Sequence, residues 1–268
     1  MNEALFAFTL TMLAGLFTCV GGLIILFCKK KNTDFLSICL SFSAGVMIYI
    51  SFVEIFAKSF ESLKYAHGEE TGLLITTIAF FAGILIISAT KKIFPHENET
   101  KTSLKECSAE IEIMPEGKKS LHRMGITTAL AIAVHNFPEG LVTFVAALHD
   151  PALGVTIAIA IAIHNIPEGI AVAVPIYYST GSKTKAILAS AASGLTEPLG
   201  AIAAYFILIR FMFNESMFGV IFALAGGIMI YISFNQLLPT AQKYGEHHQV
   251  MKGLFTGVAV MALSLVIF

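Results

Sequence analysis

A short motif that could bind a metal ion occurs twice, as HNFPEG at 135–140 and as HNIPEG at 164–169. In an α-helix, side chains four residues apart share one face, so the histidine of each copy is expected to lie beside its own glutamate. The asparagine is three residues from the same glutamate. Each copy therefore offers an imidazole, an amide and a carboxylate to a neighbouring helix.

This set of side chains suits divalent transition metals. Imidazole nitrogens and carboxylate oxygens favour Zn²⁺ above all, with Fe²⁺, Mn²⁺ and Co²⁺ as alternatives, and suit Mg²⁺ or Ca²⁺ poorly. Two histidines and two glutamates complete a tetrahedron. The asparagines and Glu197 add enough ligands for a second metal bridged by the glutamates, roughly 3.5 to 4 Å from the first by analogy with two-metal sites. The candidate ligands are His135, Asn136, Glu139, His164, Asn165, Glu168 and Glu197.

The apolar surroundings of the motifs also favour a cation. An ionised carboxylate in hydrocarbon is costly unless it is paired, and no lysine or arginine lies close to these glutamates in the sequence. Pro138 and Pro167 cannot donate to the carbonyls four residues earlier, which predicts a kink and free backbone oxygens in each helix. Gly140 and Gly169 are expected to let the two helices approach each other closely.

Two further candidate ligands lie on an earlier apolar run. Glu54 can act on the ion path, or it can be a surface residue that reaches to the membrane interface. Met47 lies seven residues earlier on roughly the same helical face and can be a ligand or a packing residue. For Glu197, the alternative to a ligand is a protonated carboxyl bonded to a backbone carbonyl.

The composition places these residues in a membrane protein. The 268 residues are 56% hydrophobic and 13% charged, with a mean hydropathy of +0.79, which is outside the range of soluble domains. Apolar runs long enough to cross a hydrocarbon core of about 30 Å number eight. We predict an all-α, single transmembrane domain with spans at about 3–28, 34–57, 71–93, 121–148, 151–177, 184–210, 215–241 and 249–268.

The positive charges predict the orientation of these spans. Lysines and arginines concentrate in the loops after spans one, three, five and seven, and the exceptions are Lys58, Lys64 and Arg210. Because cytoplasmic loops carry the excess of positive charge, both termini are expected outside and the segment 95–120 is expected to be a cytoplasmic loop. This predicts a multi-pass protein of the plasma or inner cell membrane.

A longer internal repeat predicts how the spans are arranged. AGVMIYISFVEI at 44–55 recurs as GGIMIYISFNQL at 226–237, with seven of twelve positions identical. Spans one to three therefore resemble spans six to eight. Since five spans separate the members of each pair, the second copy runs in the opposite direction. This is an inverted repeat around spans four and five, as in transporters with a site at the midplane.

Several other classes of function are excluded or disfavoured. A net charge of -1 without a basic stripe gives no footprint for nucleic acid. The four cysteines have no paired spacing that would indicate disulfides or a CxxC metal site. There is no GxxxxGK[ST] loop, which excludes direct drive by ATP. We expect the chain not to be an enzyme and to have no resident cofactor.

On these residues the chain resembles the ZIP (Zrt/Irt-like) family of divalent metal transporters, most closely its bacterial members. The resemblance covers the whole chain, including the GLTEPLG context of Glu197. It implies metal uptake through a binuclear site. His135, Glu139, His164 and Glu168 would form the first metal site, and Asn136, Asn165 and Glu197, with the shared glutamates, the second. It also implies a span-two ligand, either Met47 or Glu54, and movement of spans one, four, five and six against the rest.

The function we expect is secondary transport of Zn²⁺, and of Fe²⁺, Mn²⁺ or Co²⁺, into the cytoplasm by alternating access. The alternatives are a membrane-embedded zinc hydrolase and a passive metal-selective channel. An HExxH motif would favour the hydrolase, but the sequence contains no such motif. The expected partners are the divalent ions and the lipid bilayer, and a homodimer is left open.

Overall fold

The computed structural model of the chain describes residues 3–28, 32–93, 115–210 and 214–267, and all regular structure in these ranges is helical. Within them, eight helical segments are long and apolar enough to cross a membrane. The all-α, eight-span prediction is thereby confirmed. The first span joins α1 to a short 3₁₀ segment, the second joins α2 to α3 through a π-helical turn, and the seventh joins α9 to α10 in the same way.

The helices have the following bounds: α1 Glu3–Gly22, α2 Thr33–Ile50, α3 Phe56–His67, α4 Glu69–Ile93, α5 Pro115–His149, α6 Pro151–Thr180, α7 Lys183–Gly194, α8 Thr196–Arg210, α9 Glu215–Ile232, α10 Leu238–Tyr244 and α11 His247–Ile267. The 3₁₀ segment is η1 Leu23–Leu26, and the π-helical turns are η2 Ser51–Ile55 and η3 Ser233–Leu237.

Some boundaries differ from the expected ones. The second span continues to His67, ten residues past its expected end at 57. Residues 115–120, expected in the cytoplasmic loop, form the start of α5. Proline is well suited to the first position of a helix because its φ is already fixed and its missing N–H would have no partner there. The rest of that loop, and Lys29 to Lys31, lie outside the described residues.

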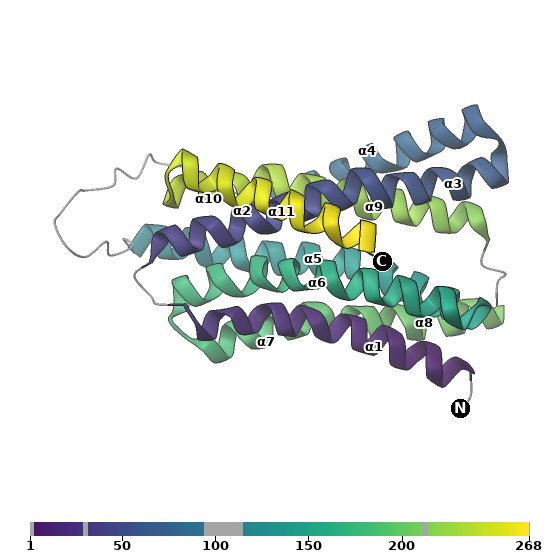
Figure 1. Cartoon of the computed structure of the whole chain (residues 1–268), viewed down its shortest axis with the longest axis horizontal. Helices are drawn as coiled ribbons and strands as arrows, with labels where there is room; N and C mark the ends of the chain where they lie inside the picture. Colours follow the sequence, from purple (N-terminus) through teal and green to yellow (C-terminus); the bar gives the residue numbers. More distant parts are fainter. Residues whose placement is uncertain (1–2, 29–31, 94–114, 211–213, 268) are drawn as a thin grey trace.

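The helices pack as two groups. The site group consists of α1, α5, α6, α7 and α8, which contact one another extensively; the support group consists of α2, α3, α4, α9, α10 and α11. Figure 1 shows α1, α6, α7 and α8 along one side of the bundle and most of the support group along the other, with α5 between them. Helix α2 packs on α6, and α9 packs on α5, so the boundary runs along both motif helices.

Glycines bring backbones together inside each group. A Cβ atom added to Gly169 of α6 would collide with the carbonyl of Thr18 on α1, and one added to Gly140 of α5 would collide with Glu197 on α8. In the support group, Gly45 of α2 abuts α11 in the same way. Among the described glycines, every such close approach lies within one group. The boundary between the groups is instead formed by side chains.

One prediction tests this glycine packing. Gly169→Ala should lower the stability of the protein by about 1 to 3 kcal/mol, because the new methyl group must push α6 away from α1. The melting temperature of the purified protein in detergent measures this. Val155→Ile is the matched control, since it adds one carbon to a side chain of α6 that is 37% exposed. Equal melting temperatures for the two variants would contradict close backbone packing at Gly169.

The two copies of the longer repeat share a local structure. Both contain a π-helical turn at the same place, Ser51–Ile55 in one copy and Ser233–Leu237 in the other. In each turn the first serine donates a hydrogen bond to the carbonyl four residues earlier, Met47 at 2.6 Å and Met229 at 2.9 Å. The sequence similarity thus extends to an unusual backbone conformation. The inverted relation of the copies stays a prediction.

Candidate metal centre

The histidines and glutamates of the two motifs pair across the helices. Nε2 of His135 on α5 lies 2.7 Å from Oε1 of Glu168 on α6, and the two form a hydrogen bond. Nε2 of His164 on α6 lies 3.3 Å from Oε1 of Glu139 on α5, within ion-pair distance but not aligned for a hydrogen bond. Neighbouring antiparallel helices place the start of one motif beside the end of the other. The four side chains therefore form two pairs, each between α5 and α6, rather than one pair on each helix.

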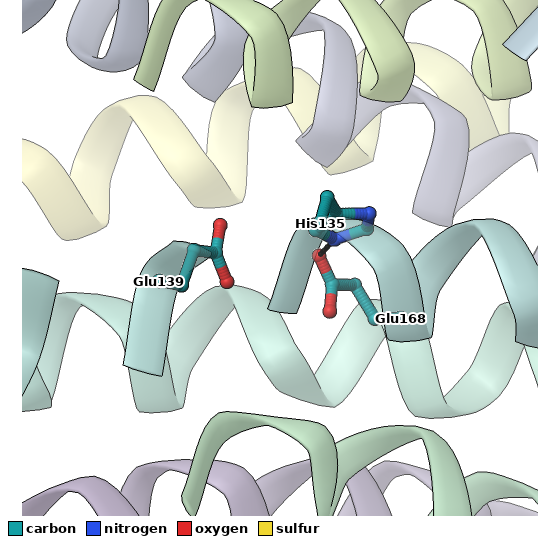
Figure 2. Close-up of side chains that lie close together, drawn as sticks. All are labelled: His135, Glu139 and Glu168. Carbon is teal, nitrogen blue, oxygen red and sulfur yellow. Dashed lines mark hydrogen bonds and ion pairs between the residues drawn. The ribbon is translucent and has the colours of Figure 1, made fainter. Parts of the chain in front are cut away.

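Three of these residues are close enough to share one cation. A donor atom from each of His135, Glu139 and Glu168 lies within 4.8 Å of the other two, and all three side chains are buried. Figure 2 shows the hydrogen bond between His135 and Glu168, with the Glu139 carboxylate further along α5. His164 lies outside this compact set although it contacts Glu139.

Asn136 lies next to His135 and Glu168 of this set. One atom of its amide lies 3.0 Å from Nε2 of His135 and 3.1 Å from Oε2 of Glu168. A nitrogen in this place can donate a hydrogen bond to Oε2 of Glu168, whereas an oxygen there would be a further ligand for a cation. Rotation of the amide by half a turn exchanges the two. The same side chain can therefore satisfy the site with or without a metal.

Several buried donor and acceptor atoms of the set have no hydrogen-bond partner. Both carboxylate oxygens of Glu139 and both ring nitrogens of His164 are in this state. Leaving polar or charged atoms unpaired in an apolar interior costs several kcal/mol. A divalent cation held by Glu139 and His164 would remove that cost, so the donor set fits a transition metal.

Glu197 lies beside the motifs at a break in the sixth span. Helix α7 ends at Gly194 and α8 begins at Thr196, which places Glu197 in the first turn of α8. The partial positive charge of a helix N-terminus stabilises a carboxylate there. Asn165 of α6 donates from Nδ2 to Oε1 of Glu197 at 2.5 Å and to the carbonyl of Ala14 at 2.9 Å.

The remaining atoms of this pair are unsatisfied. Oε2 of Glu197 and Oδ1 of Asn165 are buried without a hydrogen-bond partner. Both are oxygen donors suited to a metal ion. Glu197 does not belong to the compact set of His135, Glu139 and Glu168. Asn165 and Glu197 therefore each keep one unpaired buried oxygen next to the hydrogen bond that joins them.

The two span-two candidates have different environments. Met47 is buried in the main hydrophobic core at 1% exposure. Glu54 lies in the π-helical turn η2, its Oε1 accepts from Nζ of Lys58 at 2.6 Å, and its Oε2 is buried and unpartnered. Glu54, Lys58 and Glu61 also line a cavity of about 340 Å³. Glu54 does not belong to the compact set of His135, Glu139 and Glu168.

One expectation about the motif glycines was wrong. Gly140 and Gly169 were expected to bring the two motif helices together, but they contact α8 and α1 instead. Each glycine follows its glutamate directly, and a step of one residue in a helix turns the side chain by about 100°. The glutamates face the site, so the glycines face away from it. Periodicity alone could have indicated this.

The break in the sixth span and the parts that Ser43 and Thr128 play at the boundary were not foreseen. Gly194 and Pro198 flank the break and are the sequence signals that could have indicated it. At the boundary, Ser43 Oγ of α2 donates to the carbonyl of Pro167 at 2.7 Å, and Thr128 Oγ1 of α5 donates to Oε1 of Gln236 at 2.7 Å. No sequence pattern singles out Ser43 or Thr128.

Comparison with known proteins identifies the family of the chain. The family model described as "ZIP Zinc transporter" matches residues 95–265. The chain is 52% identical over 279 residues to a protein of Clostridium perfringens and 48% identical over 272 residues to one of Streptococcus mutans, both named "Zinc transporter ZupT". The alignments cover all of this chain and 98% and 100% of those relatives, respectively. With this identity over its full length and eight helices that can span a membrane, the chain belongs to the ZIP family.

Proposed function

We propose that the chain transports Zn²⁺ across the cell membrane into the cytoplasm, with Fe²⁺, Mn²⁺ and Co²⁺ as further substrates. The observation that carries the proposal is the set of buried, partly unpaired imidazole and carboxylate groups between α5 and α6. Membership of the ZIP family and relatives named zinc transporters support zinc as the main substrate. The metal is cargo, and the proposal includes neither a resident cofactor nor a catalysed reaction.

The first metal would bind between the two motif helices. His135, Glu139, His164 and Glu168 would supply its ligands, with Asn136 turning its oxygen inward when the metal is present. Glu54 and Met47 would serve on the outer part of the path, and the cavity beside Glu54 supports this role for Glu54. The lysine bound to Glu54 would be displaced by the incoming ion.

A second metal would bind beside the first. Asn165 and Glu197 carry the unpaired oxygens that support it, and the motif glutamates would bridge the two ions. The backbone of Glu197 packs on Gly140, directly after Glu139 in the chain, so the two glutamates lie on contacting segments. This second site would make the centre binuclear.

Alternating access would result from movement of the site group against the support group. The contacts between glycines and neighbouring backbones support this division, because in the described residues they all lie inside one group. Side-chain hydrogen bonds, such as Ser43 to Pro167, connect the groups and can exchange partners as the groups move. The site would move with α5 and α6, which carry most of its ligands.

The proposed orientation follows the positive-inside rule. Both termini would lie outside, and residues 95–120 would face the cytoplasm as one loop of a single transmembrane unit. The outer part of the path would then be the end that carries Glu54 and Glu61. Homodimer formation stays part of the proposal.

Zinc uptake into proteoliposomes tests the proposed function. Purified protein should give saturable uptake of Zn²⁺ that Fe²⁺, Mn²⁺ and Co²⁺ inhibit and Mg²⁺ does not. Protein-free vesicles are the control. Uptake that rises linearly with zinc concentration would indicate a channel, and uptake equal to that of empty vesicles would contradict transport.

A further prediction concerns pH. Histidine and glutamate must lose their protons to bind a metal, so protons compete with zinc and the affinity should fall as the pH falls. We expect the zinc concentration for half-maximal uptake to rise by about tenfold or more between pH 7.5 and pH 5.5. Initial rates at several zinc concentrations measure this, with equal pH on both sides of the vesicle. An unchanged half-maximal concentration would contradict a site built from these side chains.

A further inference from the structure

An apolar hollow of about 290 Å³ lies between α5 and the two support helices α4 and α9. Its wall on α5 includes Val134 and Pro138, which are next to the motif residues His135 and Glu139 in the chain. The hollow therefore lies behind the candidate metal centre and shares none of its ligands. It crosses the boundary between the site group and the support group.

The hollow opens towards the lipid. Ile86 of α4 and Val134 of α5 line it and are 54% and 53% exposed, and Phe137 is 39% exposed. All three are apolar and lie within membrane-spanning segments. The wall consists of hydrocarbon side chains throughout, so it offers water too few hydrogen-bond partners to hold it. A hydrocarbon group from the bilayer suits this surface.

The corresponding place on the other motif helix is closed by the protein itself. Ser43 of α2 and Ala225 of α9 directly precede the two copies of the longer repeat, and Pro167 corresponds to Pro138 in the short one. Ser43 donates a hydrogen bond to the carbonyl of Pro167 at 2.7 Å. Ala225 has no group that can do the same, and it lines the hollow together with Pro138. One boundary is thus closed by a hydrogen bond, while the other contains an apolar hollow.

We propose that this hollow is a binding site for one lipid acyl chain. Its volume is about twice the roughly 150 Å³ of an engineered protein cavity that binds benzene, which leaves room for a length of hydrocarbon chain. The bound chain occupies the boundary along which α5 meets α9. The proposal goes beyond metal transport, and the lipid would bind whether or not the protein transports zinc.

Tryptophan fluorescence tests the site, because the sequence contains no tryptophan. Ile86→Trp places a reporter at the rim of the hollow, and Leu263→Trp places one on a 60% exposed position of α11 as the control. Each protein is reconstituted with phosphatidylcholine brominated in the middle of its acyl chains, which quenches nearby tryptophan, and is then diluted into detergent micelles. Fluorescence at position 86 should recover at least threefold more slowly than at position 263.

A variant that fills the hollow completes the test. Ile221→Phe, added to Ile86→Trp, should remove the slow recovery, and Leu224→Phe provides a second filling variant if the first does not fold. Equal recovery at positions 86 and 263 would overturn the proposal, as would slow recovery that persists in a folded filling variant. The readout is lipid release rather than zinc flux, so the result stands whatever the uptake assays show.

Discussion

Replacing Glu168 by alanine is expected to abolish saturable zinc uptake. Glu168 belongs to the compact donor set, and it also holds the ring of His135 at 2.7 Å. The substitution therefore removes one ligand and frees a second to turn away. Loss of residues that only orient metal ligands already costs about 10- to 100-fold, so loss of a ligand should lower the initial rate by more than about 100-fold.

Two variants make this prediction specific. Glu70→Ala removes an exposed carboxylate near the start of α4 and should transport zinc like the parent protein. Glu168→Gln keeps the size of the side chain but not its charge, so it should lose most of the activity if charge compensation matters. Zinc uptake in proteoliposomes with equal amounts of folded protein gives the comparison. Uptake by Glu168→Ala within twofold of the parent would exclude Glu168 from the metal site.

Glu139→Ala should have a comparably severe effect, for a different reason. Neither oxygen of Glu139 has a hydrogen-bond partner, so its removal breaks no hydrogen bond and only the 3.3 Å ion-pair contact with His164 is lost. The protein should therefore fold at least as stably as the parent while losing uptake. A melting temperature that is unchanged or higher, together with lost uptake, would separate a ligand from a structural residue. Retained uptake would show that Glu139 is not a ligand.

The number and kind of helices could be predicted from the sequence because hydrocarbon thickness sets a minimum length for a spanning apolar run. The candidate ligands also came from the sequence, since a duplicated His/Glu motif in an apolar run needs compensation for its charge. Both conclusions depend on residues that are near each other in the chain. The helical period then indicates which of them share a face.

The pairing of these residues could not be predicted in the same way. Periodicity placed His135 beside Glu139, but the hydrogen bond of His135 is to Glu168 on the next helix. That choice depends on how far α6 is shifted along α5, and the shift is set by packing with α1 and α8. The π-helical turn that carries Glu54 is a similar case, because one extra residue in a turn leaves no mark in the apolar pattern.

The two histidines are expected to differ although their motifs are nearly identical. His135 is fully buried, belongs to the compact set and is held by Glu168. His164 is 4% exposed, lies outside the compact set and is not aligned with Glu139. A positioned ligand contributes more than one that must first be ordered, because the ordering has an entropic cost. His135→Ala should therefore weaken zinc binding more than His164→Ala does.

We expect His135→Ala to lower zinc affinity by more than about 100-fold and His164→Ala by about 10-fold, compared with the roughly 10- to 100-fold cost of losing a residue that only orients a metal ligand. Equilibrium zinc titration of the purified variants measures both values, and His67→Ala, at the end of α3, is the control. Saturable uptake should survive in His164→Ala with a higher half-maximal concentration. Equal losses in the two variants would mean that the His135–Glu168 pair and the His164–Glu139 pair hold the ion equally. In that case the compact set would not be the arrangement that binds the ion, because a symmetric site would require His164 to move onto the ion as closely as His135.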